Sequence, residues 1–290
     1  MTYEDVNEVK ANFDNVYTAP TPHSYLKLMT HHGYEISDQA RPYCAEGAKL
    51  MREINGDSAP LQMLDVGCSY GIGAAGVKFG RTFAEMTRFV KDDLPQGYDD
   101  ASNTMREWLN GSRTASTIHC VGMDSSAPAI KFAIDAGLLD GGIPRDLEDA
   151  DCTLTEEDLQ LVRTSNYMIS TGAIGYVTET TLNKLLPELG TQINGKVGRW
   201  CVVTILRMFD TEPVRESFER HGFKFGQIPG VFLRQRRFAD DEERNGVLEM
   251  LHERGFDTTG YEDDGHHYAN LYIATPPDQY HLLEKRLSEM

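Results

Sequence analysis

The segment that most constrains the fold spans residues 61–73, where an apolar run ends at a glycine-rich turn and a helical pattern begins. Its letters are LQMLDV followed by GCSYGIG. Glycines in such a turn let the backbone take positive φ and approach a ligand closely, and the helix N-terminus that follows offers unpaired N–H groups. The segment predicts the opening of a βαβ unit with a ligand crevice at the carboxyl end of its strand. A tight turn without a ligand is the alternative.

Further strands and helices alternate along the chain. We expect strands at 116–123, 143–147, 167–171 and 200–206, with helices at 128–136, 155–163 and 179–189 between them. After residue 208 the order becomes helix 213–221, strand 230–236, helix 240–254 and strand 269–274. The alternation indicates parallel strands, and two late strands around a helix fit an antiparallel sheet edge. The predicted fold class is therefore α/β: a Rossmann-like, doubly wound, seven-stranded, mostly parallel sheet with an antiparallel last strand.

We expect two regions along the chain. Residues 1–58 read as a helical segment, broken by Pro20 and Pro22, that covers the substrate as a lid. Residues 59–290 form the ligand-binding domain. Asp124 follows Asp65 at far more than the roughly 20 residues of a minimal βαβ unit, so residues 80–115 must be a helical insertion.

The charge balance limits the partners. Lys and Arg number 28 against 45 Asp and Glu, a formal charge of −17, which opposes binding to nucleic acid. No apolar stretch approaches the roughly 20 residues that a membrane span needs, and the acidic N-terminus does not resemble a signal peptide. Five scattered cysteines fit a reducing cytoplasm. The expected partner is a small-molecule substrate, and a homodimer is compatible with the sequence.

No metal site is expected. In the adjacent pairs His31-His32 and His266-His267 neighbouring side chains point apart, so a pair could hold an ion only if distant acids joined it. The basic run at 234–237 has two interpretations: it pairs with Asp240, Asp241 and Glu242, or it borders a substrate pocket.

The turn resembles motif I of the class I S-adenosylmethionine-dependent methyltransferases, D-x-G-x-G-x-G, with Ser69 in the middle glycine position. The nicotinamide fingerprint G-x-G-x-x-G fails at that same residue. The resemblance implies S-adenosylmethionine as cofactor, with Asp65 beside its methionine part and the Gly67 backbone at its amino group. Cys68, Ser69 and Gly71 would complete this cofactor-binding turn.

Two later strand ends supply further cofactor-binding candidates. Asp124, followed by Ser125, would accept hydrogen bonds from the two ribose hydroxyls, although it could instead be the N-cap of the next helix. In the resembled fold the next loop contacts adenine, which assigns the adenine edge to Asp146 and its face to Leu147. An ordinary surface loop is the alternative for that pair.

The fourth strand ends in Thr171-Gly172, which we expect to contact the cofactor, and Tyr176 would stand beside the sulfonium, because an aromatic face attracts a cation. The [Asp/Asn]-Pro-Pro-[Tyr/Phe] tetrapeptide of nucleobase and protein-amide methyltransferases is absent here, which argues against those substrates. Aromatic walls for the substrate are expected from Tyr17, Tyr25 and Phe132. Ordinary packing is the alternative for Tyr17 and Tyr25, and packing in the core is the alternative for Tyr176.

The blocks GCSYG, 172–179, 207–209 and 235–240 also resemble azetidine-2-carboxylate synthases, which cyclise S-adenosylmethionine itself. Two reactions follow from the resemblances, with Tyr17 and Tyr176 as the catalytic candidates. The first is methyl transfer to a small-molecule acceptor, which is the commoner chemistry on this architecture. The second uses S-adenosylmethionine as sole substrate and releases methylthioadenosine. Cofactor binding without catalysis is a third alternative.

Overall fold

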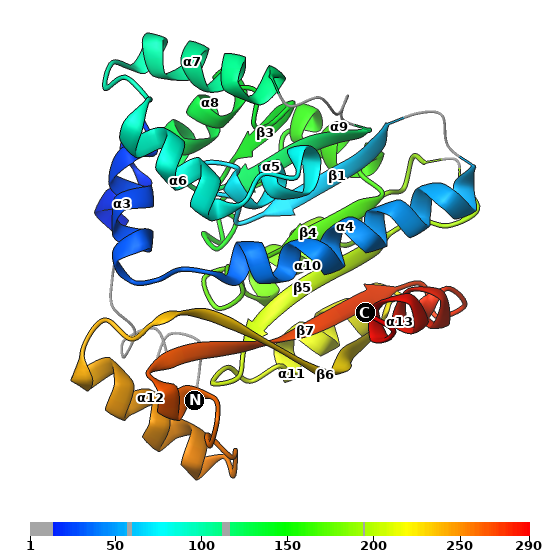
Figure 1. The fold of residues 1–290 in the computed structure, drawn as a ribbon. Helices are drawn as coiled ribbons and strands as arrows, with labels where there is room; N and C mark the ends of the chain where they lie inside the picture. The colour runs from blue at the N-terminus through cyan, green and yellow to red at the C-terminus, as the bar shows by residue number, and fades with distance from the viewer. Residues whose placement is uncertain (1–13, 57–59, 112–116, 194) are drawn as a thin grey trace.

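A seven-stranded sheet forms the centre of the computed structural model, which describes residues 14–56, 60–111, 117–193 and 195–290 (Figure 1). Its strand order is β3-β2-β1-β4-β5-β7-β6. Neighbours from β3 to β5 pair in parallel, and β7 is antiparallel to both β5 and β6, which confirms the predicted fold class. The strands are β1 (Leu61–Val66), β2 (Ile118–Asp124), β3 (Gly141–Pro144), β4 (Tyr167–Ser170), β5 (Trp200–Leu206), β6 (Lys224–Arg237) and β7 (His266–Thr275).

Helices cover both faces of this sheet. In Figure 1, α4 and α13 lie on the near face and α10 and α11 on the far face. The helices before β2 are α2 (Asp14–Tyr17), α3 (His23–His31), α4 (Ile36–Asn55), α5 (Ile72–Phe79), α6 (Phe83–Asp92) and α7 (Tyr98–Asn110). The later ones are α8 (Ala127–Asp135), α9 (Glu156–Thr164), α10 (Glu179–Leu185), α11 (Glu212–Arg220), α12 (Asp241–Glu253), the 3-10 turn η1 (Glu262–Asp264) and α13 (Tyr280–Ser288).

The central strands are buried because helices cover both of their faces. Every residue of β5 is buried, as its apolar sequence WCVVTIL predicts for a central strand of a parallel sheet. The predicted strand at 143–147 is wrong in position, since β3 is Gly141–Pro144. Glycine suits β3 because a Cβ on Gly142 would lie 2.4 Å from a methyl carbon of Ile130 on the helix beneath. Glycine has a low strand propensity, so propensity alone does not predict a strand at Gly142.

The described part of the insertion between α5 and β2, residues 80–111, carries the helices α6 and α7, while residues 112–116 lie outside the described residues. Helix α6 begins with a capping box formed by Thr82 and Glu85, and the predicted N-cap Thr155 forms one with Asp158 at the start of α9. Helix α13 and the length of β6 were not predicted. The division at residue 58 stays a prediction, because residues 1–13 and 57–59 lie outside the described residues. Within the described part of the chain, no helix is long and apolar enough to cross a bilayer.

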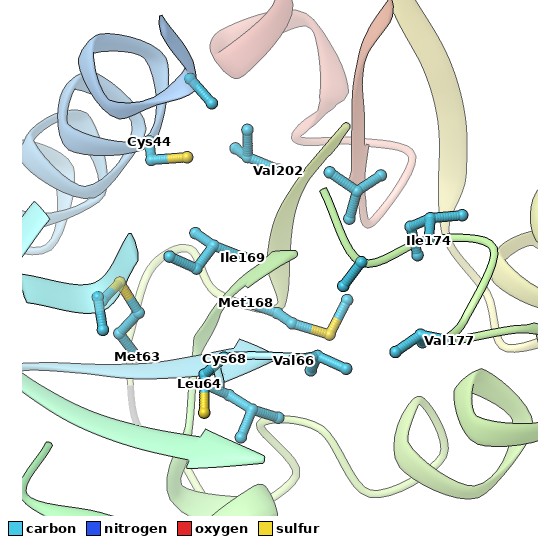
Figure 2. Close-up of a cluster of buried hydrophobic side chains, with 14 of the residues drawn as sticks. Cys44, Met63, Leu64, Val66, Cys68, Met168, Ile169, Ile174, Val177 and Val202 are labelled. Atoms are coloured by element: carbon cyan, nitrogen blue, oxygen red, sulfur yellow. The ribbon is translucent and has the colours of Figure 1, made fainter. Parts of the chain in front are cut away.

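The core joins the sheet to the loops that follow its strands. Figure 2 shows Val66 at the end of β1 and Met168 of β4 near Ile174 and Val177, which belong to the segment after β4. All four residues are buried. The loop at the carboxyl edge is therefore held by apolar packing as well as by its backbone, which positions the polar residues beside it.

Helix α4 approaches the sheet closely at Gly47. The Tyr167 hydroxyl of β4 donates a 2.8 Å hydrogen bond to the Cys44 carbonyl, and a Cβ on Gly47 would lie 2.5 Å from that hydroxyl oxygen. We expect Gly47→Ala to lower the free energy of unfolding by about 1–3 kcal/mol, because overpacking outweighs the better helix propensity of alanine. Urea unfolding followed by circular dichroism measures this change. In a Tyr167→Phe background the cost should shrink; an equal cost there would contradict the steric explanation.

Candidate functional site

A cavity of about 390 Å³ lies where the carboxyl ends of β1, β2 and β4 meet. Its walls come from the loops after these strands, from the N-terminal helices and from β6. The structure brings together almost all of the predicted site residues. Those that line the cavity are Tyr17, Tyr25, Asp65, Gly67, Cys68, Ser69, Asp124, Ser125, Asp146, Leu147, Thr171, Gly172 and Tyr176.

The glycine-rich turn has the backbone that its sequence predicts. Gly67 has φ 75°, and a Cβ there would lie 2.3 Å from the Ala173 Cβ, so only glycine fits. Ser69 takes a left-handed φ of 49° in the position where the resembled motif has glycine. Gly71 also has positive φ, but it is the N-cap of α5 and does not line the cavity. Its predicted contact with the cofactor is therefore wrong, and its role is to turn the chain into the helix.

Asp65 is a buried acid with an unpaired oxygen. Its side chain faces the cavity, the residue is 2% exposed, and Oδ2 has no hydrogen-bond partner among the described residues. Burial raises the pKa of this carboxyl to about 7, a backbone hydrogen bond from Ala74 opposes the shift, and the nearby charge of Asp124 adds to it. An orphaned carboxylate oxygen in a cavity is suited to a cationic hydrogen-bond donor on a ligand.

Asp124 connects the first two strand ends. Its Oδ2 accepts a 2.8 Å hydrogen bond from the Ser69 N–H, and Oδ1 accepts a 2.9 Å bond from the Ser126 N–H. A carboxylate oxygen has two lone pairs, so each oxygen keeps one acceptor position. The N-cap of α8 is Ser126, whose hydroxyl accepts from the Ala129 N–H, so the N-cap alternative for Asp124 is wrong. Burial raises the pKa of Asp124 above its usual range.

The loop after β3 forms another wall. Leu147 is buried, and Asp146 accepts a 3.2 Å hydrogen bond from the Glu148 N–H. Glu148 in turn accepts hydrogen bonds from the Thr178 N–H and hydroxyl at 2.8 and 2.6 Å, which hold the loop to the start of α10. The alternative of an ordinary surface loop does not fit this tethered, cavity-lining segment.

Aromatic residues form another part of the cavity wall. The ring centroids of Tyr17 and Tyr25 are 5.4 Å apart, and the Ser126 hydroxyl donates to the Tyr17 carbonyl. Tyr176 is 47% exposed at the cavity, so packing in the core is the wrong interpretation for it. Phe132 is fully buried and lies edge-on to Tyr70, with centroids 6.3 Å apart. The predicted substrate contact of Phe132 is therefore wrong, because its face of α8 packs into the core.

Several lining residues were not predicted as site residues, among them Tyr34, Ser37, Gln235 and Arg236. The signal for Gln235 and Arg236 was the basic run at 234–237, through its pocket-bordering interpretation. Tyr34 and Ser37 lie in the N-terminal segment that was predicted to cover the substrate. The predicted pairing with Asp240, Asp241 and Glu242 is wrong, because Arg236 donates to Glu243 at 2.9 and 2.7 Å and Arg234 pairs with Glu35. Across the described ranges, no three His, Cys, Asp or Glu side chains gather in a way that could hold a metal ion.

No family model matches the chain, and no curated protein matches it. Among solved structures it is similar to a TehB-like SAM-dependent methyltransferase from Corynebacterium glutamicum, with 12% identity over 86% of this chain and 93% of that chain and a TM-score of 0.37. The [4+2]-cyclase SpnF gives 14% identity, 89% and 97% coverage and a TM-score of 0.37. DesVI from Streptomyces venezuelae has 11% identity over 92% of this chain and 99% of that chain, with a TM-score of 0.38. These identities and TM-scores are too low to indicate a shared activity.

The raised pKa of Asp65 makes stability depend on pH. Because its folded pKa of about 7 lies above the usual value near 3.9, the unfolding free energy should fall as pH rises through 4 to 7. Asp65→Asn places no charge in the core, so at pH 8 it should be more stable than the wild type, by up to about 4 kcal/mol at about 1.4 kcal/mol per pKa unit. Thermal or urea unfolding at pH 4 and pH 8 measures the difference. A difference of equal size at both pH values would contradict the assignment.

Proposed function

We propose that the protein binds S-adenosylmethionine and transfers its methyl group to a small-molecule acceptor. The observation that carries the proposal is the pair of carboxylates at neighbouring strand ends: the buried Asp65 has an unpaired oxygen, and the half-buried Asp124 has acceptor positions left on both oxygens. Both acids border a glycine turn too tight for any side chain at Gly67.

These residues fit the parts of that ligand. Asp124 would accept from the two ribose hydroxyls, and Asp65 would take an N–H of the ammonium group at the amino-acid end. Gly67 lets the backbone lie against the ligand, while Asp146 and Leu147 would contact the edge and face of adenine. When bound, S-adenosylmethionine supplies a methyl carbon activated by a positively charged sulfur.

The aromatic wall supports the transfer step. Tyr17 and Tyr176 line the cavity and would face a cationic sulfur, to which an aromatic ring is attracted. Methyl transfer needs the acceptor held in line with the methyl carbon, and positioning provides most of the catalysis. Burial keeps the pKa of the Tyr17 hydroxyl well above its usual range, so Tyr17 would act as a neutral wall and hydrogen-bond donor.

A second candidate is the cyclisation of S-adenosylmethionine to azetidine-2-carboxylate, favoured by the pKa of about 7 of Asp65. A carboxylate with that pKa at the amino-acid end could accept a proton from the ammonium near neutral pH. The freed amine would then form a bond to the γ-carbon. The bond between that carbon and sulfur would break, and the sulfur would leave with the electron pair as methylthioadenosine.

The sulfur-containing product tests the proposed reaction. We expect purified protein to leave S-adenosylmethionine unchanged alone, and to form S-adenosylhomocysteine when a mixture of small-molecule acceptors is added, as measured by liquid chromatography with mass spectrometry. If methylthioadenosine and an azetidine amino acid form without any acceptor, the reaction is cyclisation and the proposal of methyl transfer is wrong. Binding without turnover under every condition would leave a cofactor-binding protein.

The ribose contact gives a binding prediction. Asp124→Ala removes two charge-assisted hydrogen bonds to the ligand, each worth about 1.5–3 kcal/mol, so the Kd for S-adenosylhomocysteine should rise about a hundred-fold or more. Isothermal titration calorimetry measures this. Asp151→Ala, an exposed acid outside the cavity, is the matched control and should bind as the wild type does. Unchanged affinity in Asp124→Ala would remove Asp124 from the site.

A further inference from the structure

Gln235 of β6 brings another buried oxygen without a partner to the wall of the cavity. The residue is 4% exposed and lines the cavity, and its Oε1 has no hydrogen-bond partner among the described residues. An amide oxygen buried without a partner costs free energy, so its retention in a cavity points to a donor on a ligand.

The orientation of this amide is set by its neighbour. Nε2 donates to the Gly172 carbonyl at 3.3 Å, and a carbonyl accepts only from the nitrogen side of an amide. Gly172 has φ 73°, and a Cβ there would lie 3.1 Å from Nε2 and 3.2 Å from the Tyr34 hydroxyl. Glycine therefore lets Gln235 and Tyr34 approach this point of the chain together.

The side chains of Gln235 and Asp65 lie near two consecutive residues, Thr171 and Gly172. A Cβ on Gly73 would lie 3.5 Å from Asp65 Oδ2 and 3.2 Å from the Thr171 hydroxyl, and the next residue, Gly172, contacts Gln235. Tyr34, beside Gln235, has a pKa raised to about 12, mainly by burial and in part by the charge of Asp65. The side chains of Asp65 and Gln235 therefore lie around the same two residues of the cavity wall, Thr171 and Gly172.

We propose that Gln235 Oε1 accepts an N–H from the amino group of the ligand's amino-acid tail, a contact that rests on the proposed function. An ammonium group has three N–H donors and no acceptor. Asp65 at the end of β1 takes one donor and balances the charge, and Gln235 of β6 takes a second. Gln235 thereby makes the site selective for S-adenosyl ligands that carry the amino acid.

The test compares two ligands that differ in that tail. S-adenosylhomocysteine has the amino acid and methylthioadenosine lacks it. Calorimetric Kd values for both are measured with the wild type, Gln235→Leu, Gln235→Glu and the control Gln160→Leu, an exposed residue outside the cavity. Gln235→Leu should raise the Kd for S-adenosylhomocysteine about ten-fold or more and leave the Kd for methylthioadenosine unchanged. Gln235→Glu keeps an oxygen acceptor and should bind S-adenosylhomocysteine at least as well as the wild type.

Other outcomes overturn the assignment. If the only role of Gln235 were its hydrogen bond to the Gly172 carbonyl, both variants at 235 would lose that bond. The affinity for the two ligands would then fall by the same factor. Unchanged S-adenosylhomocysteine binding in Gln235→Leu would also overturn it, while leaving the proposed function in place. A wild-type protein that binds neither ligand would instead overturn the proposed function and this contact together.

Discussion

The hydrogen bond from the Ser69 N–H to the Asp124 carboxylate is the interaction on which the site depends. It joins the loops after β1 and β2, whose carboxyl ends meet because the two strands are parallel neighbours. The same carboxylate accepts from the Ser126 N–H, and the Ser126 hydroxyl donates to the Tyr17 carbonyl. This half-buried acid thus connects two strand ends and the start of α8 and, through Ser126, the N-terminal residue Tyr17 in the wall of the cavity.

Most of the fold could be predicted because its signals are local. The bounds of β1 and β5 match the predicted ones, since each strand is a short apolar run that ends where its polarity or glycine content changes. The position of β3 could not be predicted from propensity, because Gly142 is required by its contact with Ile130 rather than by strand preference. Helix α13 had a legible signal in Tyr280, Leu283 and Leu287, which are buried at helical spacing.

The candidate site likewise has residues that the sequence predicts and residues that it does not. Residues directly after β1, β2 and β4 could be predicted, because the carboxyl ends of parallel strands share one edge of the sheet. Tyr34 could not, and Gln235 only through one of two interpretations of the basic run around it. The return of β6 along the antiparallel edge and the path of the chain between α3 and α4 bring these two residues to Gly172. Phe132 shows the opposite error: an aromatic residue near the site in sequence points into the core, where it contacts Tyr70 and Tyr98.

The charges around the cavity favour a cationic ligand. Its lining includes the acids Asp65, Asp124, Asp146 and Glu148, and two arginines. Arg145 is paired with Asp158 at 2.9 Å and Arg236 with Glu243 at 2.7 Å, so acids outside the cavity already balance both guanidinium groups. The pyrophosphate of a dinucleotide would meet carboxylates here, and Ser69 breaks the glycine pattern that such ligands need. Burial disfavours the charged forms of Asp65 and Asp124. A ligand with a sulfonium and an ammonium would bring positive charge to these two carboxylates and so favour their charged forms.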